Sequence, residues 1–228
     1  VIIDGLTRSG KFYLGKLVSG IIGLEYFINS SEVERLIIAG LTGVISQEGA
    51  SAMIAIAVNE EIYNRAIGRD MNLRREDSSS ILNSYEKEKY LARQESKEGW
   101  EAIKKVLDIN RHSVFILHQS MMALEIIKGA IPKPHIINIR RHPVDLAFSW
   151  IQRGWGHRYT SGDGDLLNFD PIYPYADSFV PYFAIDWCEE YLQGNEYDRV
   201  VKSINYLVEK ESEAIDNHEG TICKIYYD

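Results

Sequence analysis

A glycine-bearing loop near the start of the chain has the composition of an anion-binding site. Residues 5–11 follow a short apolar run at 1–3 and precede an amphipathic stretch at 13–22, so they join an expected strand to an expected helix. Backbone N–H groups and the positive end of the helix dipole converge in such a loop and bind phosphate-like anions. The spacing Gly5-x-x-x-x-Gly10-Lys11 satisfies most of a Walker A pattern, but Phe12 replaces the Ser or Thr that binds Mg²⁺. The loop therefore predicts a nucleotide-like anion without the usual metal hydroxyl.

A histidine and two arginines directly follow later apolar runs, just as the glycine-bearing loop follows the run at 1–3. His118 follows the apolar run 113–117, and Arg140 and Arg141 follow the apolar run 135–139. An imidazole takes up a proton near neutral pH, and a guanidinium fork binds phosphate. Ligands of parallel α/β sheets lie beyond the carboxyl ends of the strands. We therefore expect the loop, His118 and Arg141 to meet at one edge of a sheet.

Strands that alternate with helices predict how these residues are positioned. The pattern indicates one α/β domain over residues 1–228, a three-layer P-loop-like fold with a mostly parallel central sheet flanked by helices. Residues 46–108 are expected to form a helical insertion or cap, or else ordinary outer helices of the same sheet. Residues 153–181 form a long irregular stretch rich in aromatic side chains, which pack in the interior or line a ligand pocket. A helical stretch at 183–215 and a last strand at 221–227 complete the prediction.

Composition excludes several classes of protein. The chain has 228 residues and a net charge of −8, which argues against a general nucleic-acid binder because such proteins carry excess Lys and Arg. Cys188 and Cys223 are the only cysteines and form no CxxC motif, so neither a zinc site nor a disulfide scaffold is indicated. No apolar run is long enough to span a bilayer, and no signal peptide is evident. We expect a cytoplasmic protein.

The segment 136–150, IINIRRHPVDLAFSW, resembles the 3′-phosphate-binding segment of sulfotransferases that use 3′-phosphoadenosine 5′-phosphosulfate (PAPS). The loop TRSGKFY at 7–13 is similar to their 5′-phosphosulfate loop, with Lys11 and Phe12 in place of two threonines. The terminal IYYD at 225–228 resembles a family strand that contacts adenine, after which the family's C-terminal nucleotide-binding loop would follow, so part of the domain is expected to be missing. The resemblance assigns PAPS and its product 3′-phosphoadenosine 5′-phosphate (PAP) to Arg8, Ser9, Gly10, Lys11, Phe12, Tyr13, Arg141, Ser149 and Tyr226.

The same resemblance implies sulfuryl transfer to a hydroxyl or amine of a small molecule or carbohydrate. His118 would act as the general base, with Glu32 or Glu34 as the alternative, while Arg8 and Lys11 would stabilise the leaving oxygen. No metal is required, and the oligomeric state stays open. Two other functions are compatible with the residues: a P-loop nucleotide kinase or NTPase, and a non-catalytic nucleotide-binding protein on the same fold.

Structural roles are the alternative for several of these residues. His118 could be a hydrogen-bonded histidine at a strand end, and Lys11 a solvated lysine in the first turn of a helix. Arg140 and Arg141 could be a surface pair near Asp145. Ser149 could bond back to the preceding turn of its helix.

Overall fold

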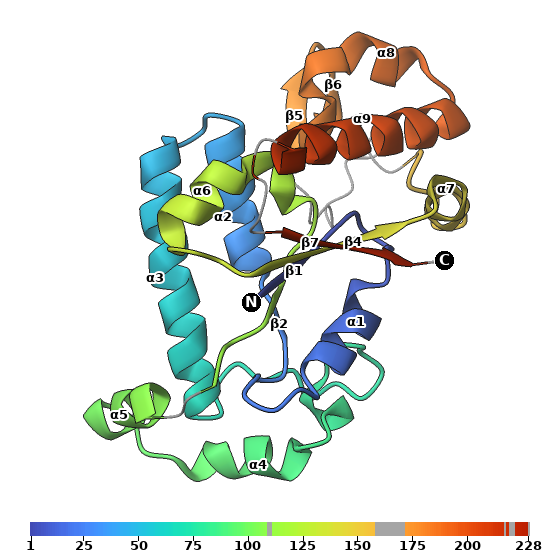
Figure 1. The fold of residues 1–228 in the computed structure, drawn as a ribbon. Coiled ribbons are helices and arrows are strands. Elements are labelled where there is room, and N and C mark those ends of the chain that lie inside the picture. Colours follow the sequence, from blue (N-terminus) through green and yellow to red (C-terminus); the bar gives the residue numbers. More distant parts are fainter. Residues whose placement is uncertain (109–110, 158–171, 217, 219–221, 228) are drawn as a thin grey trace.

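The computed structural model describes residues 1–108, 111–157, 172–216, 218 and 222–227 (Figure 1). Its centre is a parallel sheet of five strands in the order β2-β3-β1-β4-β7. From one edge to the other these strands are β2 (Ile28–Asn29), β3 (Phe115–Ile116), β1 (Ile2–Asp4), β4 (Ile136–Arg141) and β7 (Ile222–Tyr227). The predicted three-layer α/β fold is confirmed.

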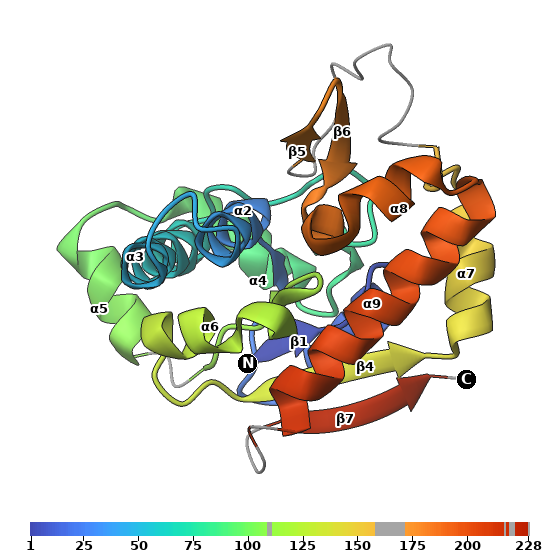
Figure 2. The ribbon, with the colours of Figure 1, turned by 90° about the horizontal axis from the view of Figure 1, so that it is seen from above.

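Helices cover both faces of this sheet (Figures 1 and 2). The α-helices are α1 (Lys11–Val18), α2 (Ser31–Leu41), α3 (Gln47–Ala66), α4 (Lys87–Ala92), α5 (Trp100–Asp108), α6 (Leu124–Ala130), α7 (Pro143–Ile151), α8 (Cys188–Gln193) and α9 (Glu196–Asp216). Short 3₁₀ turns are η1 (Ile81–Asn83), η2 (Arg93–Glu95), η3 (Ser120–Ala123) and η4 (Tyr182–Trp187). An antiparallel hairpin of β5 (Ile172–Tyr175) and β6 (Ser178–Pro181) lies apart from the sheet.

Successive side chains of a strand point to opposite faces of the sheet, which explains why helices pack on both faces. Ile2 packs into a core with α2, α3 and α6, whereas Ile3, on the opposite face of the same strand, packs against Val18 of α1. A third apolar cluster joins α7 to α9 and includes Leu6 of the first loop. Within the expected insertion 46–108, α3 contributes Ile54 to the core beside the sheet, so this helix belongs to the main packing layer.

Three local predictions differ from the structure. The first helix begins at Lys11 and ends at Val18, so it starts directly at the loop and is shorter than the predicted 13–22. Strand β2 was not predicted, because two residues are too short to show a pattern. The described part of 153–181 contains the β5–β6 hairpin, where only irregular structure was expected, and residues 158–171 lie outside the described part.

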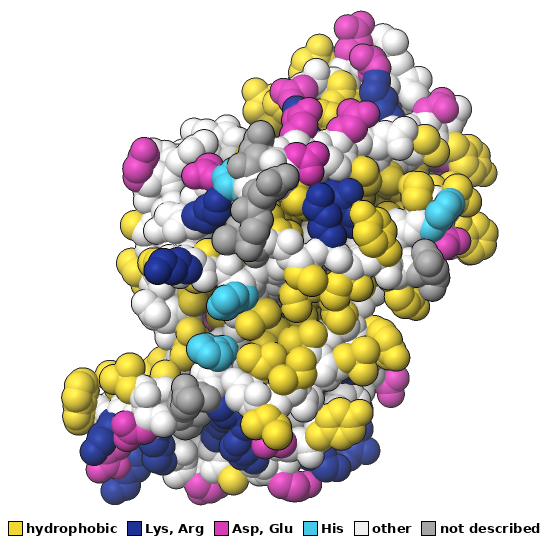
Figure 3. All heavy atoms as spheres, viewed as in Figure 1, with side chains coloured by type: hydrophobic (Ala, Val, Ile, Leu, Met, Phe, Trp, Pro, Cys, Tyr) yellow, Lys and Arg dark blue, Asp and Glu magenta, His cyan; other side chains and the backbone are white. Residues whose placement is uncertain are grey.

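Apolar and acidic side chains gather on different parts of the surface (Figure 3). Apolar side chains gather over the face formed by α1 and the amino ends of the strands, where Ile21 of the turn after α1 and Ile222 of β7 line a shallow groove. Acidic side chains gather at the top of this view, over α8 and α9. Among the described residues, no helix is both long and apolar enough to cross a membrane.

Candidate functional site

The loop between β1 and α1 is held in a conformation that depends on glycine. Gly5 has φ +150°, and a Cβ atom there would lie 2.3 Å from the carbonyl oxygen of Ile139 on the neighbouring strand. Gly10, the residue before α1, has φ +97°. Such backbone angles are disfavoured for residues with a side chain. The two glycines therefore let the loop pass close to β4 and enter the helix without a clash.

Lys11 is turned into this loop and away from solvent. Its ammonium group donates to the carbonyl oxygens of Gly5 at 2.6 Å and Leu6 at 2.8 Å, and the residue is 2% exposed. It is therefore not the solvated lysine that its position in a first helical turn allowed. Burial lowers the pKa of Lys11 to about 8, although the nearby carboxyl groups of Asp4 and Glu211 oppose this change.

Two buried carboxyl groups accompany Lys11 beneath the loop. Asp4 ends β1 and accepts hydrogen bonds from the backbone N–H and the hydroxyl of Ser120, at 2.9 and 2.6 Å. Glu211 reaches the same region from α9 and is 1% exposed. Burial raises the pKa of Asp4 to about 6 and that of Glu211 to about 8. The floor of the loop is thus a titratable cluster, which we call the buried triad of Asp4, Lys11 and Glu211.

Above the loop, the predicted phosphate-binding residues meet. Arg8 Nε donates to Ser149 Oγ at 3.1 Å, and Arg141 Nη1 donates to the carbonyl oxygen of Arg8 at 3.1 Å. Burial and the positive charges of Arg153 and Arg141 lower the pKa of Arg8. In the part of the chain that the structure describes, no carboxylate forms an ion pair with Arg8, Arg141 or Arg153, which we call the arginine cluster. Repulsion among these cations favours a bound anion.

Arg140 has a different environment from its neighbour Arg141. It lies on the other face of β4 and donates to Asn138 Oδ1 at 3.2 Å and Ser212 Oγ at 3.1 Å. The bond to Ser212 ties β4 to α9, so Arg140 has a structural role, but a different one from the expected pair near Asp145. Neither arginine pairs with Asp145, which removes the expected surface pair.

The remaining residues assigned to the nucleotide are spread over several environments. Ser9 is buried, and its hydroxyl has no hydrogen-bond partner among the described residues. Tyr13 is exposed on α1, as the resemblance requires of a residue that stacks on a base. Phe12 instead packs edge-on against Phe27 at 5.7 Å, so its ring belongs to the core under α1. It contributes a backbone N–H to the loop and no polar side chain.

The end of β7 offers a second aromatic residue that sequence reasoning missed. Tyr226 is exposed and lines a cavity beside α9 together with Ser9, Arg140 and Arg141. Tyr227, on the opposite face, has its ring 5.9 Å from the guanidinium carbon of Arg141. Side chains alternate along the strand, so the ring of Tyr227 lies near the guanidinium of Arg141, while Tyr226 faces the cavity that Arg141 also lines. The sequence alone did not show that both tyrosines lie near Arg141.

His118 is paired with one of the two glutamates that were considered as alternative bases. Glu34 Oε1 lies 2.7 Å from His118 Nδ1 and also accepts the backbone N–H of His118 at 2.8 Å. Neutral imidazole with its proton on Nδ1 keeps an acceptor lone pair on Nε2, so a carboxylate at Nδ1 prepares the ring to take a proton. Glu32 lies elsewhere and lines a separate cavity beside α3. The two predicted candidates, His118 and Glu34, therefore form one unit.

The turn that carries His118 is fastened to the loop. Gln119 has φ +57° and its backbone N–H donates to the carbonyl oxygen of Gly5 at 3.2 Å. Its side-chain amide donates to Thr7 Oγ1 at 3.3 Å and accepts from the hydroxyl of Tyr182 at 2.7 Å. These bonds explain why residues far apart in the sequence are adjacent at the carboxyl edge of the sheet.

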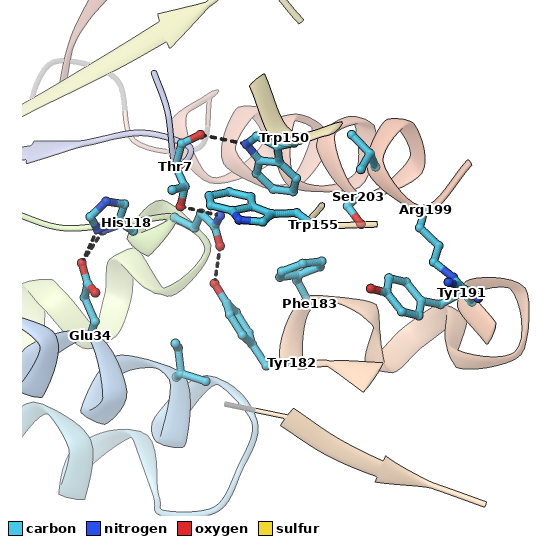
Figure 4. A pocket seen from close by; sticks show the side chains of 13 residues that line it. Thr7, Glu34, His118, Trp150, Trp155, Tyr182, Phe183, Tyr191, Arg199 and Ser203 are labelled. Atoms are coloured by element: carbon cyan, nitrogen blue, oxygen red, sulfur yellow. Dashed lines mark hydrogen bonds and ion pairs between the residues drawn. The ribbon is translucent and has the colours of Figure 1, made fainter. Parts of the chain in front are cut away.

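His118 and Glu34 stand at one end of a cavity of about 210 Å³ (Figure 4). Five aromatic side chains line it: Trp150, Trp155, Tyr182, Phe183 and Tyr191. We call it the aromatic cavity. Thr7 lines it too, and the carbonyl oxygen of Thr7 accepts a hydrogen bond from Trp150 Nε1 at 3.0 Å. Because the next residue is Arg8, a single loop separates the aromatic cavity from the arginine cluster.

No family model matches this chain, and the comparisons with curated proteins and with solved structures also found no match. Among the described residues, no group of three or more His, Cys, Asp or Glu side chains is arranged to hold a metal ion. The site is therefore interpreted from its own geometry.

Proposed function

We propose that this chain is a PAPS-dependent sulfotransferase, in which the arginine cluster and the loop of residues 5–11 bind the nucleotide and the aromatic cavity binds the acceptor. The observation that carries the proposal is the meeting of Arg8, Arg141 and Ser149. Arg8 belongs to the first loop, whereas Arg141 and Ser149 belong to the segment 136–150, and the resemblance assigns all three to the nucleotide. Their hydrogen bonds, and the lack of a carboxylate partner for the guanidinium groups among the described residues, support an anionic ligand.

The residues around the loop are chemically suited to such a nucleotide. Arg141 and Ser149 offer a guanidinium fork and a hydroxyl to a phosphate. Among the described residues, the N–H groups of Lys11 and Phe12 at the start of α1 make no backbone hydrogen bond, and the helix dipole also favours an anion there. Ser9 supplies a buried hydroxyl that has no partner in the described chain. When bound, PAPS supplies the sulfuryl group: the acceptor oxygen bonds to sulfur as the sulfur–oxygen bond to the 5′-phosphate breaks, and PAP leaves with that electron pair.

Four residues of the chain have defined tasks in this reaction. His118 Nε2 takes the proton from the acceptor hydroxyl, and Glu34 stabilises the imidazolium that results. Arg8 directly follows Thr7, which lines the aromatic cavity, and we assign to its charge the task of offsetting the charge that develops on the leaving oxygen. Lys11 supports the loop from below, since its ammonium group is bonded to two loop carbonyls.

A P-loop kinase or NTPase is the main competing function. The packing of Phe12 against Phe27 argues against it, because no side-chain hydroxyl stands at the metal position of the loop. A non-catalytic nucleotide-binding protein would share the arginine cluster but would not depend on His118.

Calorimetric titration with PAP, alongside ATP with and without Mg²⁺, tests the proposal. We expect PAP to bind without metal, and Arg141→Ala to weaken binding about 10- to 100-fold, since charge-assisted hydrogen bonds contribute about 1.5–3 kcal/mol. Arg75→Ala is the matched control, because Arg75 is an exposed arginine far along the chain from the cluster. Absence of PAP binding would refute the proposal. Binding of ATP only with Mg²⁺ would support the kinase, and sulfuryl transfer that survives His118→Ala would contradict the assigned base.

A further inference from the structure

The aromatic cavity has a second polar end, opposite to His118. Tyr191 of α8 and Ser203 of α9 line it there, and they are 2% and 3% exposed. Figure 4 shows the Tyr191 hydroxyl directed into the cavity toward Phe183, with Ser203 nearby. Within the described residues, neither hydroxyl has a hydrogen-bond partner. Both hydroxyl oxygens keep some accessible surface although their residues are buried, so they are open to a ligand from the cavity.

Ser203 could have satisfied its hydroxyl locally but does not. On the same helix, Ser212 donates to the carbonyl oxygen of Val208, four residues earlier, at 2.7 Å. This back-bond is the usual solution for a serine within a helix. The Ser203 hydroxyl makes no such bond in the structure, so its hydrogen-bonding capacity is directed to the cavity. The difference between the two serines marks Ser203 as a residue prepared for a ligand.

Tyr191 is held firmly in its position. Its ring packs edge-on against Trp187, with the centroids 5.4 Å apart, and the guanidinium carbon of Arg199 lies 5.5 Å from the ring. Arg199 also donates to the carbonyl oxygen of Tyr191 at 2.8 Å and that of Gly156 at 3.1 Å. Burial raises the pKa of Tyr191 to about 12, so the phenol is protonated at neutral pH and can donate. A rigid donor binds a ligand group with little loss of conformational entropy.

The space between the two polar ends is apolar and small. Trp155 and Phe183 lie along it, and the volume is about 210 Å³. Pockets for drug-sized ligands usually have about 300–1,000 Å³. A molecule with one ring and short polar substituents therefore suits this cavity better than a larger acceptor.

From these observations we infer that Tyr191 and Ser203 form a polar subsite that selects acceptors with two hydrogen-bonding groups at opposite ends of a small apolar body. One group is the hydroxyl that reacts beside His118, and the other is bound by the two hydroxyls at the far end. The identity of the reacting end rests on the proposed sulfotransferase function, whereas the selectivity of the far end is a property of binding alone.

Two probes that differ by one hydroxyl test this subsite. Calorimetry would compare 4-(2-hydroxyethyl)phenol with 4-ethylphenol on the whole chain without nucleotide. We expect the diol to bind about fivefold to tenfold more tightly, the effect of one or two neutral hydrogen bonds. Tyr191→Phe and Ser203→Ala should each reduce this preference, and the double variant should abolish it. Tyr197→Phe is the control, because Tyr197 is an exposed tyrosine on α9.

The outcomes separate this inference from the proposed function. Equal affinity of the wild-type chain for both probes, no binding of either, or a preference that survives the double variant would overturn the subsite. Folding of the variants is checked by their thermal unfolding, and the wild-type comparison needs no variant. PAP binding is measured independently. If PAP fails to bind while the diol preference and its loss in the variants are observed, the sulfotransferase proposal fails and the subsite stands.

Discussion

Replacement of Glu211 by glutamine should change how the stability of the protein depends on pH. Glu211 lies under the loop in the buried triad and is 1% exposed, and one of its carboxyl oxygens has no hydrogen-bond partner in the part of the chain that the structure describes. Burial raises its pKa to about 8, and the negative charge of Asp4 acts in the same direction. An ordinary glutamate has a pKa of about 4.3. The folded chain therefore holds a proton on Glu211 over a range in which the unfolded chain has released it.

The sign and size of the effect follow from this difference. Stability falls as pH rises wherever the folded state binds more protons than the unfolded state. Each such proton contributes about 1.4 kcal/mol per pH unit, so Glu211 alone lowers the free energy of unfolding by about 3 kcal/mol between about pH 5 and about pH 7. Asp4, with a pKa of about 6, steepens the loss below that pH. The lowered pKa of Lys11, about 8, makes the free energy of unfolding rise with pH, but only above about pH 8.

Urea unfolding at several pH values provides the measurement. We expect Glu211→Gln to flatten the decline of stability across the neutral range and to be relatively more stable than the wild type at its alkaline end. Glu209→Gln is the matched control, because Glu209 is an exposed glutamate on the same helix. An unchanged slope in Glu211→Gln, or a wild-type stability that rises with pH through this range, would refute the reasoning about the buried triad.

Two further predictions concern the site itself. Glu34→Gln removes the carboxylate at 2.7 Å from His118 Nδ1. Because a charge-assisted hydrogen bond is lost, kcat for sulfuryl transfer should fall about 10- to 100-fold, while PAP affinity measured by calorimetry stays the same. A matching loss of PAP affinity would show that the pair only maintains the fold. Gly5→Ala places a Cβ atom 2.3 Å from the carbonyl oxygen of Ile139. Thermal unfolding should therefore show a destabilisation of at least about 1–3 kcal/mol, and PAP binding should weaken. Wild-type behaviour in both assays would contradict the proposed loop geometry.

Much of the framework was predictable because long elements carry a repeated pattern. Strand β4 contains most of the apolar run 135–139 that predicted it. Helix α2 follows Ser30, whose hydroxyl accepts the backbone N–H of Val33 at 3.1 Å as an N-cap. Glu34, in the first turn of the same helix, is directed to His118 and makes no capping bond within the described residues. The choice between a local and a distant partner depends on tertiary structure, so it could not be read from the spacing.

The predictability of the site differed from one part to the next. The meeting of Arg8, Arg141 and Ser149 was expected from the resemblance and from the shared edge of the strands. The inward turn of Lys11 could not be foreseen, because a first-turn lysine faces solvent unless the loop carbonyls and buried acids provide partners. Tyr191 also gave no signal, since a tyrosine at helical spacing has the pattern of an ordinary core residue.

The central position of β1 in the sheet has a consequence for how the protein is made. This strand comprises residues 2–4, yet the two strands beside it are formed by residues 115–116 and 136–141. The edge strand β7, which pairs with β4, is formed by residues 222–227. During synthesis, the first apolar strand must wait for more than a hundred residues before either neighbour leaves the ribosome. Contacts between such distant segments form slowly and leave hydrophobic surface exposed in the meantime. The arrangement that brings the loop, His118 and Arg141 to one edge therefore makes early folding dependent on late parts of the chain, and gives nascent chains a long interval of exposure to chaperones and to aggregation.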